Sequence, residues 1–205
     1  MEVAESPSWR FAESVEQQLL LALWVRDALR LEIRHGPPRL ASKVPDRREH
    51  LQGSASDQWL QWWRTLVEEA VLRNDGRANA HRRPREQPVA DGPLGLVEGP
   101  DLRETLAALL PEGLAGANLL QRAATLPAGR PAFAWQVVRE VAEDVAFDHA
   151  VELDRVRGVA LVLPVEGLWW QLAGPGAVLC SAAATADPLT GRVALRAAFE
   201  SELEN

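Results

Sequence analysis

The amino-acid sequence predicts an α+β protein: N-terminal helices, a mobile linker, then helices packed on a four-stranded antiparallel β-meander. Apolar residues recur at helical spacing in several segments before residue 153, and they alternate with period two between residues 159 and 200. Three short turns, each containing glycine, separate the four expected strands, and such turns join antiparallel neighbours. The chain has 205 residues, 47% hydrophobic and 25% charged, so we expect one or two folded domains.

The first expected helix runs from Trp9 to Arg34. Residues 19–25 within it are apolar on every side, so we expect neighbours to cover it on more than one side. Ser14 and Gln17 have the spacing of a capping box, which favours a start about one turn after Trp9. Residues 35–38, with the sequence His-Gly-Pro-Pro, end this helix.

The second expected helix follows a long loop, residues 36–56, and runs from Asp57 to about Arg73. Its apolar residues fill about half of the helix circumference. Trp59, Trp62 and Trp63 lie within about 100° on that apolar face. We therefore expect these three tryptophans in the hydrophobic core, and a ligand platform or partner helix is the alternative.

Residues 74–100 form the expected linker. They contain four prolines and four glycines, with several arginines and almost no large apolar residue before Leu94. Such a segment buries too little surface to offset the entropy lost on ordering, so we expect it to be mobile. It divides the chain into an N-terminal helical segment, residues 1–73, and a C-terminal α+β domain, residues 101–205.

The C-terminal domain is expected to begin with helices and to end with strands. A short helix opens at Asp101 and closes at Pro111, a second covers residues 112–126 despite Gly113 and Gly116, and a third runs from Pro131 to about Leu153. The expected strands are residues 159–163, 168–172, 177–185 and 192–200. The first strand is apolar at every position, so we expect it to be buried on both faces.

Composition excludes several classes of partner. The formal net charge of −7 argues against wide contact with nucleic acid. The longest apolar run, residues 19–25, is far shorter than the roughly 20 residues that a membrane span needs. The N-terminus lacks the basic region of a secretory signal, so we expect a cytoplasmic protein. Arginine outnumbers lysine, Lys43 being the only lysine, which with the many alanines indicates a GC-rich bacterial genome.

Two neighbouring tryptophans, Trp169 and Trp170, are the first candidate binding residues. Successive residues of a strand point to opposite faces of its sheet. One of the two rings can therefore join the core, while the other lies on the second face. We expect that second ring to contribute to a binding surface.

Four carboxylates, Glu140, Asp144, Asp148 and Glu152, form the second candidate binding surface, at i,i+4 spacing on one helix. Like charges at this spacing destabilise an isolated helix by roughly 0.2–0.5 kcal/mol per pair. Solvent, or arginines from pairs such as Arg47–Arg48 or Arg82–Arg83 or from a partner protein, would offset this repulsion. A metal held by Asp148, His149 and Glu152 is less favoured, because a carboxylate-bridged site needs a second Glu-x-x-His helix that the chain lacks.

No motif indicates a catalytic residue. Cys180 and Ser181 lie in an apolar strand rather than on a nucleophile elbow, so we interpret Cys180 as a buried small side chain. Gly174-Pro-Gly is a turn without the lysine of a phosphate loop. Residues 81–85 are basic but lack interleaved aromatic residues, so we interpret them as part of the linker rather than as a nucleic-acid arm.

Two functions remain. The favoured one is a non-catalytic adaptor or regulatory module that binds a protein partner or self-associates, without a cofactor, metal, nucleic acid or membrane. The alternative is a small-molecule-binding protein or enzyme whose pocket, between helices and sheet, is lined by Trp169 or Trp170. A deep pocket with converging polar groups would favour the second function.

Overall fold

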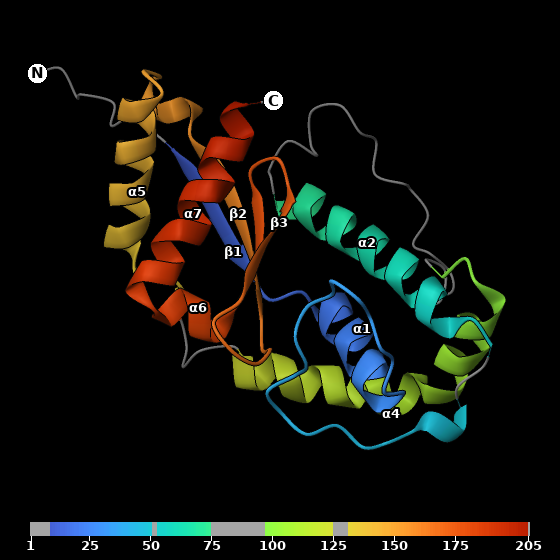
Figure 1. Ribbon diagram of the computed structural model, residues 1–205. Coiled ribbons are helices and arrows are strands. Elements are labelled where there is room, and N and C mark those ends of the chain that lie inside the picture. Colours follow the sequence, from blue (N-terminus) through green and yellow to red (C-terminus); the bar gives the residue numbers. More distant parts are fainter. Residues whose placement is uncertain (1–8, 51–52, 75–96, 125–130, 205) are drawn as a thin grey trace, which may run out of the picture.

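The computed structural model describes residues 9–50, 53–74, 97–124 and 131–204, and it shows a mixed α+β fold (Figure 1). The helices are α1 (Gln17–Ala28), α2 (Ala55–Asn74), α4 (Pro100–Ala124), α5 (Trp135–Asp148), α6 (Ala182–Ala186) and α7 (Pro188–Leu203), with short 3-10 helices at Arg48–His50 and Leu153–Arg155. Most of the predicted linker, residues 74–100, lies outside the described residues, so its mobility and the division into two segments stay predictions.

The sheet has four strands in the order β1-β2-β4-β3, with β1 (Arg10–Ser14), β2 (Arg157–Leu163), β3 (Trp170–Gly174) and β4 (Ala177–Ser181). β1 and β4 lie on either side of β2 and run parallel to it, while β3 runs antiparallel to β4. The predicted antiparallel meander is therefore wrong. The apolar run of β2 is the physical reason, because such strands pair parallel in the middle of a sheet that is covered on both faces.

The predicted last strand, residues 192–200, is also wrong, because this segment lies within the helix α7. Asp187 accepts a hydrogen bond from the backbone N–H of Thr190, and Pro188 is the first residue of the helix. Both features are typical of a helix start. Leu195 and Phe199, which suggested alternation, are also four residues apart on the buried face of α7.

The sheet separates two hydrophobic cores, so helices cover both of its faces rather than one as predicted. Side chains of Val159, Leu161 and Leu163 pack with α1, α2 and α4 in the first core. The alternate residues Ala160 and Val162 pack with α5, α6 and α7 in the second core. The prediction that this strand is buried on both faces is confirmed.

The first predicted helix, residues 9–34, is replaced by β1 and the shorter helix α1. β1 pairs with β2 along its whole length, from Arg10 beside Arg157 to Ser14 beside Leu161. Phe11 of β1 enters the second core, where its ring lies edge-on to Phe133 and Phe199. Pairing with a distant strand thus overrides the local helical periodicity, which continues only in α1.

The predicted break at Pro111 is wrong, because α4 continues through it. Its glycines let α4 approach α1 closely: a Cβ atom at Gly113 would lie 2.7 Å from the Cδ1 atom of Leu21, and one at Gly116 would overlap the indole of Trp24. The free energy gained by this packing against α1 offsets the cost of the backbone hydrogen bond that is lost at the interior Pro111.

The apolar face of α2 lies in the first core, as predicted. Trp59, Trp62 and Trp63 are at most 5% exposed, and the rings of Trp59 and Trp63 stack with centroids 5.4 Å apart. The Trp59 indole also donates a hydrogen bond to the carbonyl of Ala22 in α1. No helix of the described residues is both long enough and apolar enough to cross a membrane.

We expect Gly116→Ala to destabilise the protein by about 1–3 kcal/mol, because the added methyl group overpacks the α1–α4 contact at Trp24. At an exposed helical position the same change would stabilise by roughly 0.5–1 kcal/mol. Denaturant unfolding measures the difference. Leu119→Ala is the control, since Leu119 lies on α4 with an exposed side chain. A Gly116→Ala protein as stable as the wild type would contradict the close packing of α4 on α1.

Candidate functional site

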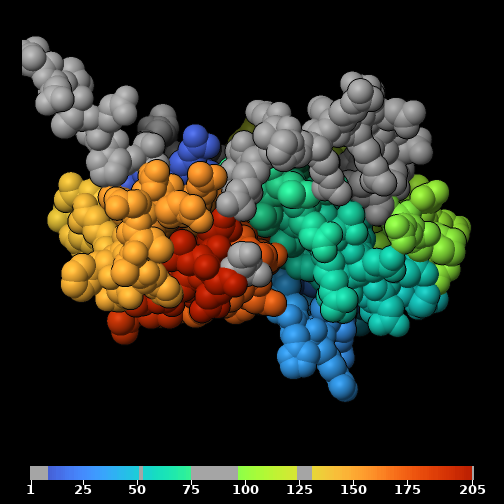
Figure 2. Space-filling model, turned by 90° about the horizontal axis from the view of Figure 1, so that it is seen from above, coloured from blue at the N-terminus to red at the C-terminus, as the bar shows by residue number. Residues whose placement is uncertain are grey.

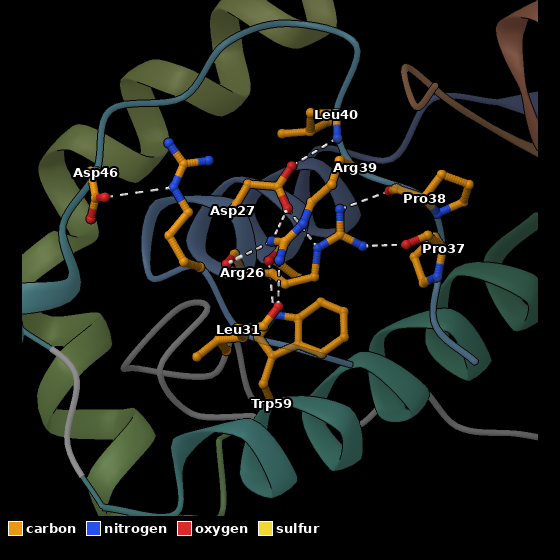
Figure 3. A network of polar contacts seen from close by, with 11 residues as sticks. Arg26, Asp27, Leu31, Pro37, Pro38, Arg39, Leu40, Asp46 and Trp59 are labelled. Atoms are coloured by element: carbon orange, nitrogen blue, oxygen red, sulfur yellow. Dashed lines mark hydrogen bonds and ion pairs between the residues drawn. The ribbon is translucent and has the colours of Figure 1, made fainter. Parts of the chain in front are cut away.

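The loop between α1 and the following 3-10 helix, residues 29–47, is the main candidate site, and we call it the anchored loop. Part of it, in light blue, projects from the body of the molecule in Figure 2. Its base rests on an ion network formed by the buried Arg26 and Asp27 at the end of α1 and by the partly exposed Arg39 of the loop (Figure 3).

Arg26 holds the loop at Pro37 and Pro38. Its guanidinium, only 2% exposed, donates to Asp27 Oδ1 at 2.7 Å, to the carbonyl of Pro37 at 2.5 Å and to the carbonyl of Pro38 at 2.7 Å. It also lies over the ring of Trp59, 5.8 Å from the ring centroid. Burial lowers the pKa of Arg26, and the hydrogen bond and charge of Asp27 oppose that shift.

Asp27 is the acceptor at the centre of the network. Its carboxylate accepts from Arg26, from the guanidinium of Arg39 at 2.9 Å and from the backbone N–H of Leu40 at 2.7 Å. Arg39 in turn donates to the carbonyl of Leu31 at 2.8 Å. The network thus ties residues 31 and 37–40 of the loop to α1. The N–H groups with which Arg26 donates these bonds are used within the protein rather than offered to a ligand.

Backbone contacts fix the same loop to the sheet. Leu40 forms an antiparallel bridge with Val165, just after β2. The backbone N–H of Ala41 donates to the carbonyl of Pro164, and that of Glu166 donates to the carbonyl of Arg39. The base of the loop is therefore held from α1 on one side and from the end of β2 on the other.

The tip of the loop is exposed and polar. Glu32, Arg34 and His35 have exposed side chains around the half-buried Ile33. His35 and Arg30 have positive φ angles, 59° and 55°, a conformation that side-chain-bearing residues adopt only where the surrounding structure holds them. A shallow groove of about 300 Å³ lies along the loop.

The two candidate tryptophans are divided between the two hydrophobic cores. Trp169 packs against the first core and Trp170 against the second, so the two rings lie on opposite faces as expected for consecutive residues. Both side chains are half-buried. Leu172, two residues along β3, is 44% exposed, so the outer side of this edge strand presents apolar surface beside Trp170.

The predicted acidic row meets arginines of α7. Glu140 forms an ion pair with Arg192, and Asp148 forms one with Arg196 at 2.6 Å. Arg196 also contacts Glu200 of its own helix at 2.7 Å, and His149 lies 3.7 Å from the same carboxylate. The other two residues of the row, Asp144 and Glu152, are exposed.

The remaining candidates are structural. Ser181 caps α6, because its hydroxyl accepts from the backbone N–H of Ala184 and Trp169 and donates to the carbonyl of Gly167. Burial, with the charge of Glu13, raises the pKa of Cys180 to about 12, so its thiol stays protonated at neutral pH. Among the described residues, no three His, Cys, Asp or Glu side chains gather in a way that could hold a metal ion.

Sequence reasoning missed the ion network, although the sequence carries a signal for it. Arg26 and Asp27 follow directly on the apolar run of residues 19–25, so a helix that is buried on every side there has two adjacent charges at its end. Charged residues are rarely buried unless they are paired. The distant partner, Arg39, could not be identified without the path of the loop.

No family model matches this chain, and no curated protein or solved structure is significantly similar to it.

We expect Asp27→Ala to destabilise the protein by about 3–5 kcal/mol, because it leaves the buried charge of Arg26 without its partner. Denaturant unfolding at pH 7 measures this loss. The control is Asp46→Ala, which removes exposed contacts with Arg30 and Arg48 and should leave the melting temperature nearly unchanged. Equal stability of the two variants would contradict the central role of Asp27.

We expect the α5–α7 ion pairs to give a small stabilisation that high salt removes. High salt should therefore lower the melting temperature of the wild type more than that of Arg196→Ala. Arg139→Ala, which breaks a pair within α5, serves as the control. The pKa of Glu140 is lowered, first by the hydrogen bond from Gln136 and then by Arg192. Its contribution is therefore present at neutral pH and is lost as the pH falls through that lowered pKa.

A chelator distinguishes this arrangement from a metal site. EDTA should leave the melting temperature unchanged at every salt concentration. A loss of stability with EDTA but not with salt would instead make Asp148, His149 and Glu152 metal ligands.

Proposed function

We propose that the protein is a non-catalytic interaction module of the bacterial cytoplasm that binds a protein partner through the anchored loop. The ion network of Arg39 with the buried pair Arg26 and Asp27 is the observation that carries this proposal, since it holds the backbone of an otherwise irregular segment. Long loops without regular structure are uncommon in compact proteins, and those that occur are usually functional.

The energetics of the network support a role in shape rather than in stability. A buried ion pair is often no more stabilising than a well-packed apolar pair, because both charges lose their hydration. Here the three side chains hold the backbone at Leu31, Pro37, Pro38 and Leu40. A loop held in one conformation before binding loses less entropy when a partner binds.

The tip offers the kind of surface that proteins recognise. Arg34 and His35 project beside the apolar Ile33, and arginine is among the residues that dominate binding energy at protein interfaces. The groove along the loop is small and open, which suits a protein surface better than an enclosed small molecule. Nucleic acid is not the proposed partner, because the net charge is −7.

The second candidate function is a small-molecule-binding protein or enzyme. It is favoured by a cavity that lies away from the predicted tryptophan pair. Trp169 and Trp170, one of which the sequence assigned to such a pocket, lie on opposite faces of the sheet. A cavity lined by two other tryptophans, Trp9 and Trp135, does exist at the start of β1.

The proposal is tested by affinity capture with three immobilised proteins: the wild type, the tip variant Arg34→Ala/His35→Ala and the control Leu119→Ala, changed on α4. Lysate of the source organism supplies the candidates, and each retained protein is then purified and its Kd measured. We expect a partner that binds the wild type and the control equally and the tip variant roughly tenfold or more weakly. Equal binding of every retained protein to all three would overturn the role of the loop.

A further inference from the structure

The cavity lined by Trp9 and Trp135 has a volume of about 360 Å³ and lies at the start of β1 and β2. In Figure 1 this end of the two strands is at the top of the sheet, whereas the anchored loop lies below, beyond α1. Its lining includes Ala12 of β1 and Val159 of β2, the latter almost fully buried. The volume falls at the lower end of the range of small-molecule sites.

Two arginines that have no partner among the described residues border this cavity. Arg10 and Arg157 are register partners in the parallel β1–β2 pair, so their side chains leave the same face of the sheet from neighbouring positions. Within the described part of the chain, neither guanidinium makes an ion pair or a hydrogen bond. Like charges placed opposite each other destabilise a sheet, so this pair opposes folding unless an anion neutralises it.

The other polar side chain of the cavity is already satisfied. The amide of Asn74, at the end of α2, donates to the carboxylate of Glu16 at 2.9 Å and to the carbonyl of Ala70 at 2.8 Å. Glu16 is also paired with Arg73. The nearby acidic group is therefore engaged, and the two guanidinium groups are left as the donors that the cavity offers.

Aromatic rings supply an apolar wall. Trp9 and Trp135 stack with ring centroids 4.4 Å apart, and both line the cavity. Trp135 is 60% exposed although it is a large apolar side chain at the start of α5. β1 is an edge strand, so the exposed indole of Trp135, on the α5 side, and the two guanidinium groups line the same cavity around that edge. The indole offers a flat surface on which a planar ring can stack.

We propose that this cavity binds a small anion, phosphate or carboxylate, that carries a planar ring. Guanidinium groups form paired, charge-assisted hydrogen bonds with both anions, and the indole of Trp135 receives the ring. The proposal is independent of the anchored loop, because it involves other residues at the opposite end of the sheet.

A structural role for the arginines gives a different expectation. Cations near the C-terminal end of a helix stabilise it, and α2 ends at Asn74, which also lines the cavity. If the arginines serve α2, their removal lowers stability. If they serve a ligand, removal relieves repulsion, so stability stays equal or rises while binding is lost.

The test is calorimetric titration at low salt with four probes: AMP, adenosine, inorganic phosphate and indole-3-acetate. The proteins are the wild type, Arg10→Gln, Arg157→Gln, Trp135→Ala and the control Arg139→Gln, which changes an exposed arginine of α5. We expect AMP or indole-3-acetate to bind more tightly than phosphate or adenosine, since each of these two probes has both the anion and the ring. AMP alone would indicate a phosphate ligand, and indole-3-acetate alone a carboxylate.

The variants should separate the two parts of the site. Arg10→Gln and Arg157→Gln should each weaken binding of the anionic ring probe roughly tenfold or more, with unchanged or higher melting temperatures. Trp135→Ala should weaken that probe and leave phosphate binding unchanged, and Arg139→Gln should bind like the wild type. Absence of binding by every anionic probe, equal binding by the arginine variants, or a lower melting temperature of both would overturn the proposal.

Discussion

β2 is apolar on both of its faces, and this property determines the arrangement of every other element. A strand with two apolar faces needs helices above and below the sheet, and strands of this kind are typical of parallel sheets covered on both faces. β1 and β4 supply the edges. α1, α2 and α4 cover one face, while α5, α6 and α7 cover the other. Segments from both ends of the chain therefore belong to one sheet, with β1 joined to β2 across most of the sequence.

The ion network follows from this burial. α1 is enclosed by α2, α4 and the sheet, so the chain must leave a crowded layer at Ala28 and return to the end of β2 near Leu40. An irregular backbone in such a place carries polar groups that need partners. Arg26 and Asp27 provide them: Arg26 donates to the carbonyls of Pro37 and Pro38, and Asp27 accepts from the backbone N–H of Leu40.

The sequence predicted those features that local patterns decide. The α+β class, the doubly buried strand and the core-facing tryptophans of α2 all follow from periodicity. The position of residues 10–14 in a sheet does not, because the partner strand lies far along the chain. The apolar residues of 192–200 fit both the period of two of a strand and the period of 3.6 of a helix. Only the capping by Asp187, with Pro188 at the first position, favours a helix. This error also hid Arg192 and Arg196, since a strand would not have placed them one helical turn apart, opposite Glu140 and Asp148. At the two candidate surfaces, the sequence pattern placed Trp9 of the cavity in a helix. It placed Arg39 of the anchored loop in a loop whose path the sequence does not show.

The arginines at the two candidate surfaces differ in whether they have partners. This difference distinguishes an arginine that holds the structure from one that is available to a ligand. Arg26 is buried with its guanidinium bonded to Asp27 and to two carbonyls, so its charge shapes the protein. Arg10 and Arg157 lie side by side with no partner among the described residues, so their charges raise the free energy of the folded state. Natural proteins keep such unfavourable arrangements mainly where function needs them, because stability is otherwise improved by simple substitution. The unpaired guanidinium groups are thus the stronger indication of a small ligand, whereas the paired ones indicate a surface that must keep its shape.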